Sequence, residues 1–517
     1  MTPTASTADR VGIDRREFLV GLSSALLVPR GRSGHRQRFA TDPFSLGVAS
    51  GDPLADRVIL WTRLAPDPPD GGMSAEPVDL QWEVAHDERF TRIVRRGTIT
   101  TRAESAHTAH VDVTGLEPDR GYWYRFRTFG AGVAVESPAG RTRTAPSAGA
   151  EVNDYRLIVA SCQKYDDGLY TAHRHVADED ARMVVFLGDY IYEGTGDPSS
   201  VRPHTLSEST TLDDYRRRHA LYRSDPDLQR AHQALPWMIV WDDHELFNDY
   251  AGLAVTADPA ARARRMAAYQ AFAEHMPLRS RFVPGHASLQ IYRQLTIGRL
   301  ATLCLLDTRQ YRSPSACGGG LHRACAEANA PGRTLLGSPQ EQWLLDTLRR
   351  STTRWQIIAQ QIPFARMDRE PGPEASVHMD KWDGYPAARE RVLDFLAARG
   401  RRDTVVLTGD NHNHWLMELK RQGDREGTAP LAPEFIGSSI SSTGDGANQR
   451  EPYLRTVGEM PHAKYLNSRR GYLRCTVTPD GWQTDYRVVP YISRPGAPVA
   501  TDAAFVVRHG AGTAERV

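Results

Sequence analysis

Five short apolar runs, each about as long as a β-strand, end in side chains that can bind metal ions, and this pattern constrains the fold most. The runs lie in the second part of the chain, with helical patterns between several of them. Alternating strands and helices predict an α/β domain whose central sheets are flanked by helices. In open α/β sheets the carboxyl ends of the strands line the ligand crevice. We therefore expect the residues that follow the runs to meet at one edge: Cys162, Asp189 with Tyr192, Asp243, Gln361, and Asp410 with His412.

The strands of this domain are expected at residues 156–160, 183–187, 237–241, 300–306, 355–359 and 404–407. Helical periodicity covers residues 257–275, residues 338–348 and residues 386–398. Ser338 and Glu341 have the spacing of a capping box, which would open the second of these helices. Gly400 is suited to end the third.

The first part of the chain, from residue 44 to about residue 144, alternates apolar and polar residues as β-strands do. Strands are expected at 57–63, 78–84 and 121–127, and their spacing predicts a small antiparallel sandwich. Residues 116–126 resemble the late strands of fibronectin type III and immunoglobulin-like modules. A linker rich in Ala, Pro, Ser and Gly then divides an all-β domain (41–146) from the α/β domain (151–508).

The first 40 residues are typical of a bacterial twin-arginine export signal. Arg15 and Arg16 precede an apolar stretch from Val20 to Val28, which is shorter than the about 20 residues needed to span a membrane. The alternative is a short buried helix beside a chance pair of arginines. We expect the twin-arginine export machinery to carry the folded protein out of the cytoplasm, without a transmembrane span. Its location would be secreted, extracytoplasmic or cell-wall associated.

The composition is that of a globular protein, with 40% hydrophobic and 25% charged residues. A formal net charge of +1 argues against a dominant nucleic-acid-binding role. The chain has 5 Cys, too few for a disulfide scaffold. Cys317 and Cys325 flank a flexible glycine-rich loop, and they form either a disulfide or two free thiols. Cys304 and Cys475 are expected in the core.

Several motifs resemble those of the calcineurin-like metallophosphoesterases. Gly188–Asp189, Asp242–Glu245 and Gly409–His412 resemble three signatures of that superfamily, with Asp in place of Asn in the second and in place of His in the third. Asp189 with Tyr192 is similar to the iron-binding pair of purple acid phosphatases. A larger set resembles the PhoD-type alkaline phosphatases over nearly the whole chain: Ser161–Cys162, residues 188–193, 241–245, 306–311 and 382–386.

This resemblance implies a mixed centre of Fe³⁺ and Ca²⁺. Cys162 thiolate, Tyr192 phenolate, Asp189 and His412 would hold the iron, because anionic donors stabilise the higher charge. Asp243, Gln361 and Asp410 offer only oxygen, which suits a hard ion such as calcium. Asp189 would bridge the two sites. This order of Asp410 and His412 follows from alignment with the third signature, and the opposite allocation stays open.

The implied reaction is hydrolysis of phosphate mono- and diesters, with attack by a metal-bound hydroxide and no covalent intermediate. His244, together with Asp189, is the predicted catalytic group, and it would donate a proton or stabilise charge beside the leaving oxygen. Arg309 either touches the substrate phosphate or pairs with an acid. The chain has no Walker A loop and no nucleophile elbow, which argues against nucleotide-loop ATPases and serine hydrolases.

Other interpretations stay open at this point. One is a phospholipase D-like or teichoic-acid phosphodiesterase, another is a surface binding protein without catalysis, and a third is an iron oxidoreductase. Bland roles also exist for single residues: Tyr190 packs, Asp242 supports a ligand or caps a helix, and His414 bonds a carboxylate. His173 and His175 are expected at the surface. No feature of the sequence specifies an oligomeric state.

Overall fold

The structure is a computed structural model that describes residue 39 and residues 41–517, except 131–132, 256–257, 287, 324, 422–426 and 449–452. The predicted export signal (1–40) lies outside the described residues, apart from Phe39. Within these ranges, no helix has both the length and the apolar character needed to cross a membrane.

The larger of two central sheets has ten strands in the order β24-β23-β22-β21-β9-β10-β11-β1-β2-β5. Its central strands are parallel, namely β9 (Tyr155–Ala160), β10 (Met183–Leu187) and β11 (Pro236–Val240). One flank adds the antiparallel strands β21 (Arg470–Val477), β22 (Gly481–Val489), β23 (Ala500–Arg508) and β24 (Glu515–Arg516). The other flank adds β1 (Val48–Leu54), β2 (Arg57–Arg63) and β5 (Thr108–Thr114).

The second central sheet has seven strands in the order β12-β13-β15-β17-β19-β18-β20. Four of them run parallel: β13 (Ala301–Leu305), β15 (Trp355–Gln360), β17 (Thr404–Thr408) and β19 (Ala432–Ile436). The antiparallel members are β12 (Arg293–Ile297), β18 (His414–Leu419) and β20 (Ala463–Asn467). Because the carboxyl ends of the parallel strands in both sheets carry the polar motifs, these ends position the site.

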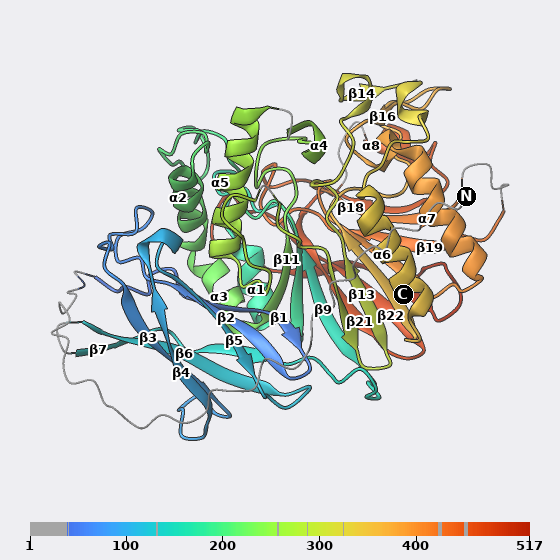
Figure 1. The fold of residues 1–517 in the computed structure, drawn as a ribbon. Coiled ribbons are helices and arrows are strands. Elements are labelled where there is room, and N and C mark those ends of the chain that lie inside the picture. Colours follow the sequence, from blue (N-terminus) through green and yellow to red (C-terminus); the bar gives the residue numbers. More distant parts are fainter. Residues whose placement is uncertain are drawn as a thin grey trace, which may run out of the picture.

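The two sheets pack against each other, and helices cover their outer faces (Figure 1). Val185, Leu303 and Ile357 meet in one buried core between the sheets. The large sheet is covered by α1 (Thr171–Asp178), α2 (Leu212–Arg223), α3 (Pro226–Ala234) and α5 (Pro259–His275). The second sheet is covered by α6 (Gly337–Arg350) and α7 (Pro386–Arg399). All residues of β10, β13 and β17 are buried, as expected for strands covered on both faces.

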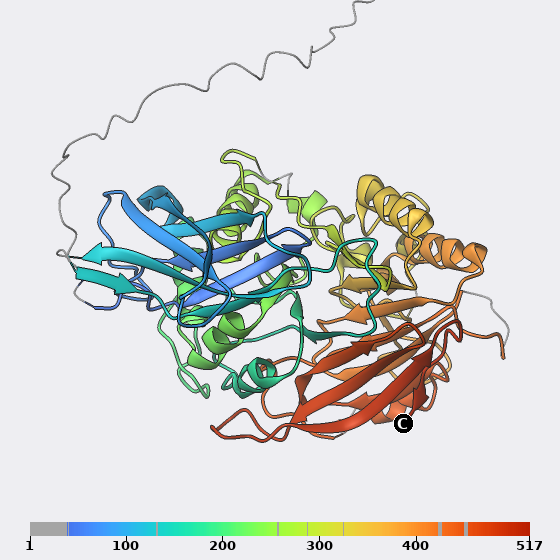
Figure 2. The same ribbon diagram turned by 90° about the horizontal axis from the view of Figure 1, so that it is seen from below.

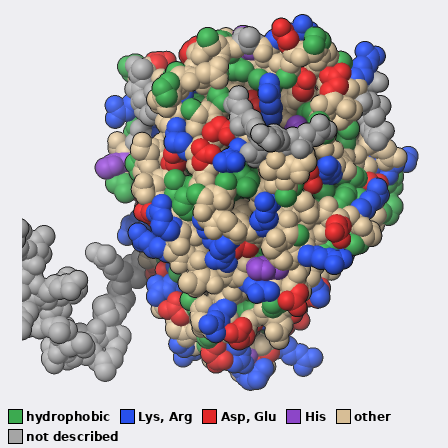
Figure 3. All heavy atoms as spheres, turned by 90° about the vertical axis from the view of Figure 1, so that its right-hand side faces the viewer, with side chains coloured by type: hydrophobic (Ala, Val, Ile, Leu, Met, Phe, Trp, Pro, Cys, Tyr) green, Lys and Arg blue, Asp and Glu red, His purple; other side chains and the backbone are tan. Residues whose placement is uncertain are grey.

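Smaller elements lie in the connections. They are α4 (Gly252–Val255), α8 (Tyr453–Val457), the two-stranded sheet of β14 (Leu321–His322) and β16 (Val377–His378), and 3-10 turns at Ala103–Ser105, Ala316–Gly318, Glu327–Asn329 and Trp382–Gly384. Cys317 and Cys325 form a disulfide, and Cys304 and Cys475 are buried. On the face shown in Figure 3, basic and acidic side chains are interspersed.

The N-terminal unit is all-β, as predicted, and lies beside the helices of the large sheet (Figure 2). Its outer sheet consists of β3 (Val78–Ala85), β4 (Ile93–Thr101), β6 (Gly121–Gly130), β7 (Val133–Glu136) and β8 (Gly140–Arg143). This sheet packs on β1, β2 and β5 through a separate core that includes Leu60, Leu80 and Phe126. However, β1 also pairs with β11, with Ser50 opposite Pro236. One layer of the sandwich therefore continues the large central sheet.

The predicted strands agree with the structure to within one residue at nearly every end, but the predicted capping box is wrong. Helix α6 begins at Gly337 and has no side-chain cap. Glu341 instead pairs with Arg391 of α7 at 2.6 Å. Gln340 turns inward, where its amide accepts from the Asp307 amide and donates to the Asp307 carbonyl, both at 2.8 Å. Tertiary contacts have thus overridden a local signal that the sequence contains.

Candidate active site

The ends of β9, β10, β11 and β17 bring most of the predicted residues together. Three overlapping groups have ligand atoms within 4.8 Å of one another: Cys162 with Asp189 and His412, Asp189 with Asp243 and His244, and Asp242 with Asp243 and Asp410. These residues come from four segments that are far apart in the chain. The residues therefore converge as expected, but from the strand ends of two packed sheets and not from one sheet edge.

The first half of the site contains the thiol and the phenol. The Tyr192 hydroxyl donates to Asp189 Oδ2 at 2.9 Å and lies 3.3 Å from His412 Nε2. Ser442 Oγ lies 2.7 Å from the same hydroxyl and donates to it. The donors predicted for the iron site therefore lie close together: Cys162, Asp189, Tyr192 and His412.

The backbone at the strand ends adopts conformations that are rare for residues with side chains. The φ angles are +59° at Cys162, +55° at Asp189, +61° at Asp410 and +55° at His412. Left-handed residues of this kind cost about 1–3 kcal/mol each and cluster at functional sites, where the surrounding fold holds them. The surrounding fold therefore holds the turns after these strands in conformations that set the directions of the four side chains.

Gly188, directly before Asp189, is required by both its conformation and its neighbours. Its φ is +96°, and a Cβ at this position would lie 2.4 Å from the Cβ of Asp242. We expect Gly188→Ala to lower the free energy of unfolding by roughly 2–4 kcal/mol, since overpacking and an unfavourable φ add together. Urea unfolding measures this change.

Gly149→Ala is the matched control for this substitution, because nothing lies within 4 Å of its Cβ position. Equal stability of the two variants would contradict the argument that Gly188 is sterically required.

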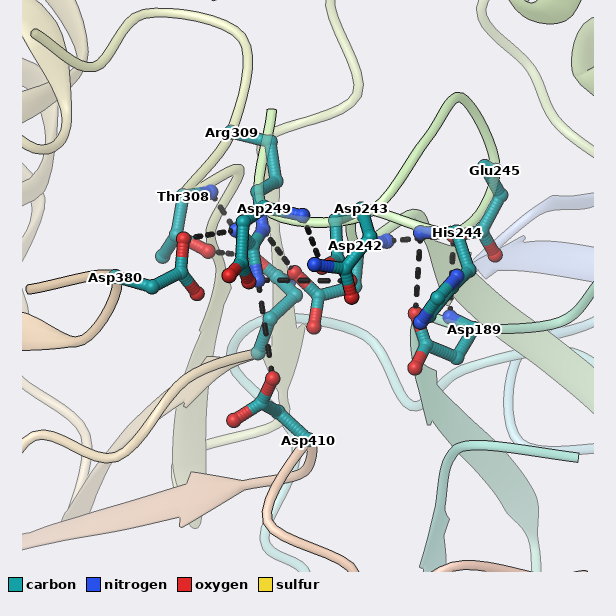
Figure 4. Close-up of polar contacts among 12 residues, drawn as sticks. Asp189, Asp242, Asp243, His244, Glu245, Asp249, Thr308, Arg309, Asp380 and Asp410 are labelled. Atoms are coloured by element: carbon teal, nitrogen blue, oxygen red, sulfur yellow. Dashed lines mark hydrogen bonds and ion pairs between the residues drawn. The ribbon is translucent and has the colours of Figure 1, made fainter. Parts of the chain in front are cut away.

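The second half of the site is a cluster of carboxylates around Arg309 (Figure 4). The Arg309 side chain is 0% exposed and contacts Asp242 through Nε and Asp380 through Nη1 at 2.8 Å. Its Nη2 lies 3.5 Å from Asp243 and 3.7 Å from Asp410. Of the two roles considered for Arg309, the structure supports pairing with acids. A fully buried guanidinium shared by four carboxylates is not available to the substrate.

Gln361 follows β15 at the end of the second sheet, but its side-chain amide already has hydrogen-bond partners. Its Oε1 accepts from the Thr308 amide at 2.9 Å and from the Thr308 hydroxyl at 2.6 Å, and its Nε2 donates to the Leu306 carbonyl at 2.8 Å. Both lone pairs of Oε1 are used. Gln361 therefore ties the end of β15 to the loop that carries Arg309, and we leave it out of the proposed ligand set.

Two charged residues of the cluster, Asp380 and Lys381, were missed by the sequence analysis. Lys381 Nζ lies 2.6 Å from Asp410 Oδ1 and 3.1 Å from Asp380 Oδ2. Asp380 also receives Arg312, whose Nη1 donates to its carbonyl at 3.0 Å. The available signal was their position directly before the motif at residues 382–386.

His244 lies between the two halves and is oriented by Glu193. Its Nδ1 is 2.9 Å from Glu193 Oε2, and its ring stacks on Tyr192 with centroids 4.2 Å apart. The side chain is 22% exposed, more than any of the carboxylates beside it. Burial opposes protonation of His244, but Asp243, Asp189 and Glu193 outweigh it and raise its pKa well above the ordinary value.

Other pKa shifts follow from crowding of charge in a buried place. Burial, and then the charge of Asp189, raises the pKa of Cys162 well above its ordinary range. Burial and neighbouring carboxylates likewise raise the pKa of Asp189. Burial also opposes ionisation of Asp243, but the positive charges of Arg309 and His244 lower its pKa. Burial lowers the pKa of His412 to about 3, which keeps the ring neutral, the form that binds metals.

Glu245 organises the backbone beneath the site. This buried carboxylate accepts from the amides of Asp189 at 3.1 Å, Tyr190 at 2.7 Å and Asp242 at 2.8 Å. It therefore joins the turns that follow β10 and β11. Sequence analysis had recognised Glu245 only as part of a motif.

For the residues that were expected to have structural roles only, some predictions agree with the structure and others do not. Tyr190 is buried and donates to or accepts from His232 at 2.9 Å, which agrees with packing. The prediction for His414 is wrong in its partner: the ring Nδ1 accepts a hydrogen bond from the Ser438 amide at 3.0 Å, whereas a carboxylate partner was expected. His173 is not at the surface: it is fully buried and its Nε2 lies 2.6 Å from Gln163 Oε1. Its helix packs this face against the core, a consequence of tertiary contacts.

The donor set fits bound cations. Asp242 Oδ2 and Asp410 Oδ2 are buried and have no hydrogen-bond partner among the described residues. Both carboxylates belong to the same potential metal group as Asp243. Unpaired buried carboxylate oxygens are costly, and a bound cation would satisfy them. Paired sheets flanked by helices, with potential metal ligands gathered at the strand ends, place this protein in the class of metal-binding α/β proteins with the site between two sheets.

Comparison with known proteins gives the family. Residues 157–486 match the family model of PhoD-like phosphatases, and residues 30–146 match that of the N-terminal domain of PhoD-like phosphatases. Alkaline phosphatase D of Bacillus subtilis (strain 168) is 45% identical over 512 residues, which are 95% of this chain and 87% of that protein. A solved structure, "Structure of PhoD", has a TM-score of 0.89 and 46% identity and covers 93% of each chain. The chain belongs to the PhoD-like phosphatase family, and it is a phosphoric ester hydrolase.

Proposed function

We propose that this protein is an exported, metal-dependent hydrolase of phosphate mono- and diesters. The observation that carries the proposal is the series of three overlapping ligand groups, which Asp189 and Asp243 link to one another and which has His244 in the middle group. A relative with 45% identity is named alkaline phosphatase D, which supports the same reaction. Export is proposed from the twin-arginine pattern in residues 1–40, and it would place the enzyme outside the cytoplasm.

We further propose Fe³⁺ and Ca²⁺ as the cofactors. Cys162, Asp189, Tyr192 and His412 would hold the iron, and Asp242, Asp243 and Asp410 would hold calcium, with Asp189 between the two. The donor chemistry supports this allocation, because thiolate and phenolate favour ferric iron and carboxylates favour calcium. When bound, the ions would neutralise the phosphoryl oxygens and activate water for attack.

The side chains of this chain have separate tasks in that reaction. His244, partly exposed and with a pKa raised by the neighbouring carboxylates, would face the leaving oxygen and give it a proton or stabilise its charge. Glu193 holds the other ring nitrogen, which orients the imidazole. Arg309 would hold the carboxylates of the calcium half together by its ion pairs with them, without contacting the substrate.

The proposed domain division is an export signal at residues 1–40, a β-sandwich domain at 41–146 and the catalytic domain at 151–508. The two family-model matches, at 30–146 and 157–486, support a boundary between residues 146 and 157. Pairing of β1 with β11 supports a rigid attachment of the sandwich to the catalytic unit.

The experiment that tests the function is release of p-nitrophenol from its mono- and bis-phosphate esters at alkaline pH by natively exported protein. Activity should disappear after chelation and return when calcium is restored. The ratio of the two esters ranks the monoesterase against the diesterase, including a lipid or teichoic-acid diesterase. Failure to hydrolyse either ester, in protein shown to contain iron and calcium, would contradict the proposal and favour a binding role.

Replacing Cys162 with Ser tests the allocation of the metals. Loss of the thiolate should remove most of the iron while calcium stays, and kcat should fall by more than about 100-fold, the upper end for residues that only support a ligand. Metal analysis by mass spectrometry measures both ions. Cys475→Ser, at another buried thiol outside the site, is the control. Iron that stays in Cys162→Ser would refute the assignment.

A further inference from the structure

We propose that Lys381 binds the phosphate group of the substrate, and that the disulfide between Cys317 and Cys325 positions it. This inference rests on the proposed phosphoesterase function and adds a substrate-binding cation to it. Three observations carry it: the exposure of Lys381, the anchoring of its segment, and the contact of that segment with the disulfide loop.

Lys381 is the cation of the acid cluster that reaches the solvent side, among the described residues. Arg309 and Arg312 are 0% exposed, whereas the Lys381 side chain is 14% exposed. An ammonium group has three N–H donors, and the ion pairs of Lys381 with Asp380 and Asp410 use two of them. One donor is left for an oxygen of a bound phosphate.

Calcium at the carboxylates would strengthen this role. Asp410 Oδ1 receives Lys381 at 2.6 Å and belongs to the group proposed to hold that ion. A cation bound to Asp410 would take over part of the neutralisation that Lys381 now provides. Lys381 would keep its ion pair with Asp380, which holds the ammonium beside the cluster.

The segment that carries Lys381, residues 376–382, is held by two sets of contacts, one with the buried arginines and one with the loop around β14. In the first set, Asp380 Oδ1 accepts from Arg309 Nη1 at 2.8 Å and also pairs with Arg312. In the second set, the Met379 amide donates to the Gly320 carbonyl at 2.8 Å. Strand β16 of the segment pairs with β14, Leu321 opposite His378.

The disulfide closes the loop to which the segment is attached. Gly320 and β14 lie between Cys317 and Cys325, with sulfur atoms bonded across a sequence separation of 8 residues. Met379 forms a small core with Ala316 and Ala328, and Cys325 packs against it. Figure 1 shows β14 and β16 side by side at the outer end of the molecule, above the second sheet. Because β14 and β16 are two residues long, few hydrogen bonds hold the pair, and the disulfide adds a covalent restraint on the loop that carries β14.

The first test is Lys381→Met in the holoenzyme. KM for p-nitrophenyl phosphate, and the Kd for inorganic phosphate measured by calorimetry, should both rise by about tenfold, the value of one charge-assisted contact. Lys381→Arg should recover most of this loss, and the metal content should stay unchanged. Lys464→Met removes a surface lysine that pairs with Glu418 at 3.3 Å, and it is the control. Unchanged KM and Kd in Lys381→Met would overturn the proposal.

The second test removes the disulfide with the double variant Cys317→Ser and Cys325→Ser. KM should rise severalfold, and the Met379 amide should lose its protection from hydrogen exchange. Combined with Lys381→Met, the double variant should add nothing further, because both changes act through one side chain. Additive effects, or full protection of Met379, would overturn the positioning role of the disulfide.

The two proposals fail in different ways. A wild-type holoenzyme that hydrolyses no ester would contradict the proposed function, whereas phosphate binding by calorimetry would still report on Lys381. An active wild-type enzyme with an unaffected Lys381→Met variant would contradict this inference alone.

Discussion

Asp189→Asn should lower kcat/KM by at least about 10³-fold, more than the 10–100-fold typical of groups that only support a metal ligand. Asp189 is the residue shared by the thiol-containing group and the group that includes His244. An amide in its place has one neutral oxygen, so neither half of the site would keep a shared anion. Steady-state kinetics and metal analysis on the same preparation measure the effect, and both iron and calcium should fall.

The control is Asp178→Asn, which changes a carboxylate that is 57% exposed and pairs with Arg230 on the surface. Its activity and metal content should equal those of the wild type. Retention of both metals by Asp189→Asn would show that the carboxylate does not bridge. Retention of activity would remove it from the mechanism altogether.

Glu245→Ala should lower the free energy of unfolding by about 3–5 kcal/mol, because it leaves three buried backbone amides without an acceptor. These amides belong to Asp189, Tyr190 and Asp242, so the turns after β10 and β11 should lose their relative position as well. Activity is therefore expected to fall even below the unfolding transition. Urea unfolding and kcat/KM at low temperature separate the two effects.

Glu208→Ala serves as the comparison, since Glu208 is 53% exposed and only pairs with Arg264. A surface pair of this kind contributes about 0–1 kcal/mol. If Glu245→Ala were no less stable than Glu208→Ala, the buried carboxylate would not be the link between the two turns.

Much of the fold follows from local patterns. The runs at 183–187 and 57–63 became β10 and β2 with unchanged ends, because a short apolar or alternating run has few ways to bury itself. Gly400, at a φ of +63°, ends α7 as predicted, because glycine reaches this conformation without strain. Pairing of β1 with β11 is different in kind. It joins residues almost two hundred positions apart, and no pattern in the sequence of either strand indicates which strand it pairs with.

The candidate ligands show the same difference between what local sequence predicts and what contacts with distant segments decide. Cys162, Asp189 and Asp243 follow parallel strands of one sheet, so their convergence could be inferred from the rule that such strands end at one edge. His412 follows a strand of the second sheet, and only the packing of the two sheets brings it to the same place. Gln361 also follows a strand, yet Thr308 occupies its amide oxygen. Whether a side chain at the edge is free or engaged depends on a neighbour from another segment, which spacing along the chain does not reveal.

By itself, the sequence determined the strands, the order of the motifs and the chemistry of the donors, because these depend on residues close together in the chain. Only the tertiary structure decided how the charges are paired. Arg309 could have faced the substrate, but four carboxylates from distant segments enclose it. Lys381 is left as the cation on the exposed side of that cluster, among the described residues. Burial and charge balance are properties of the whole packed site, since each depends on which segments meet there.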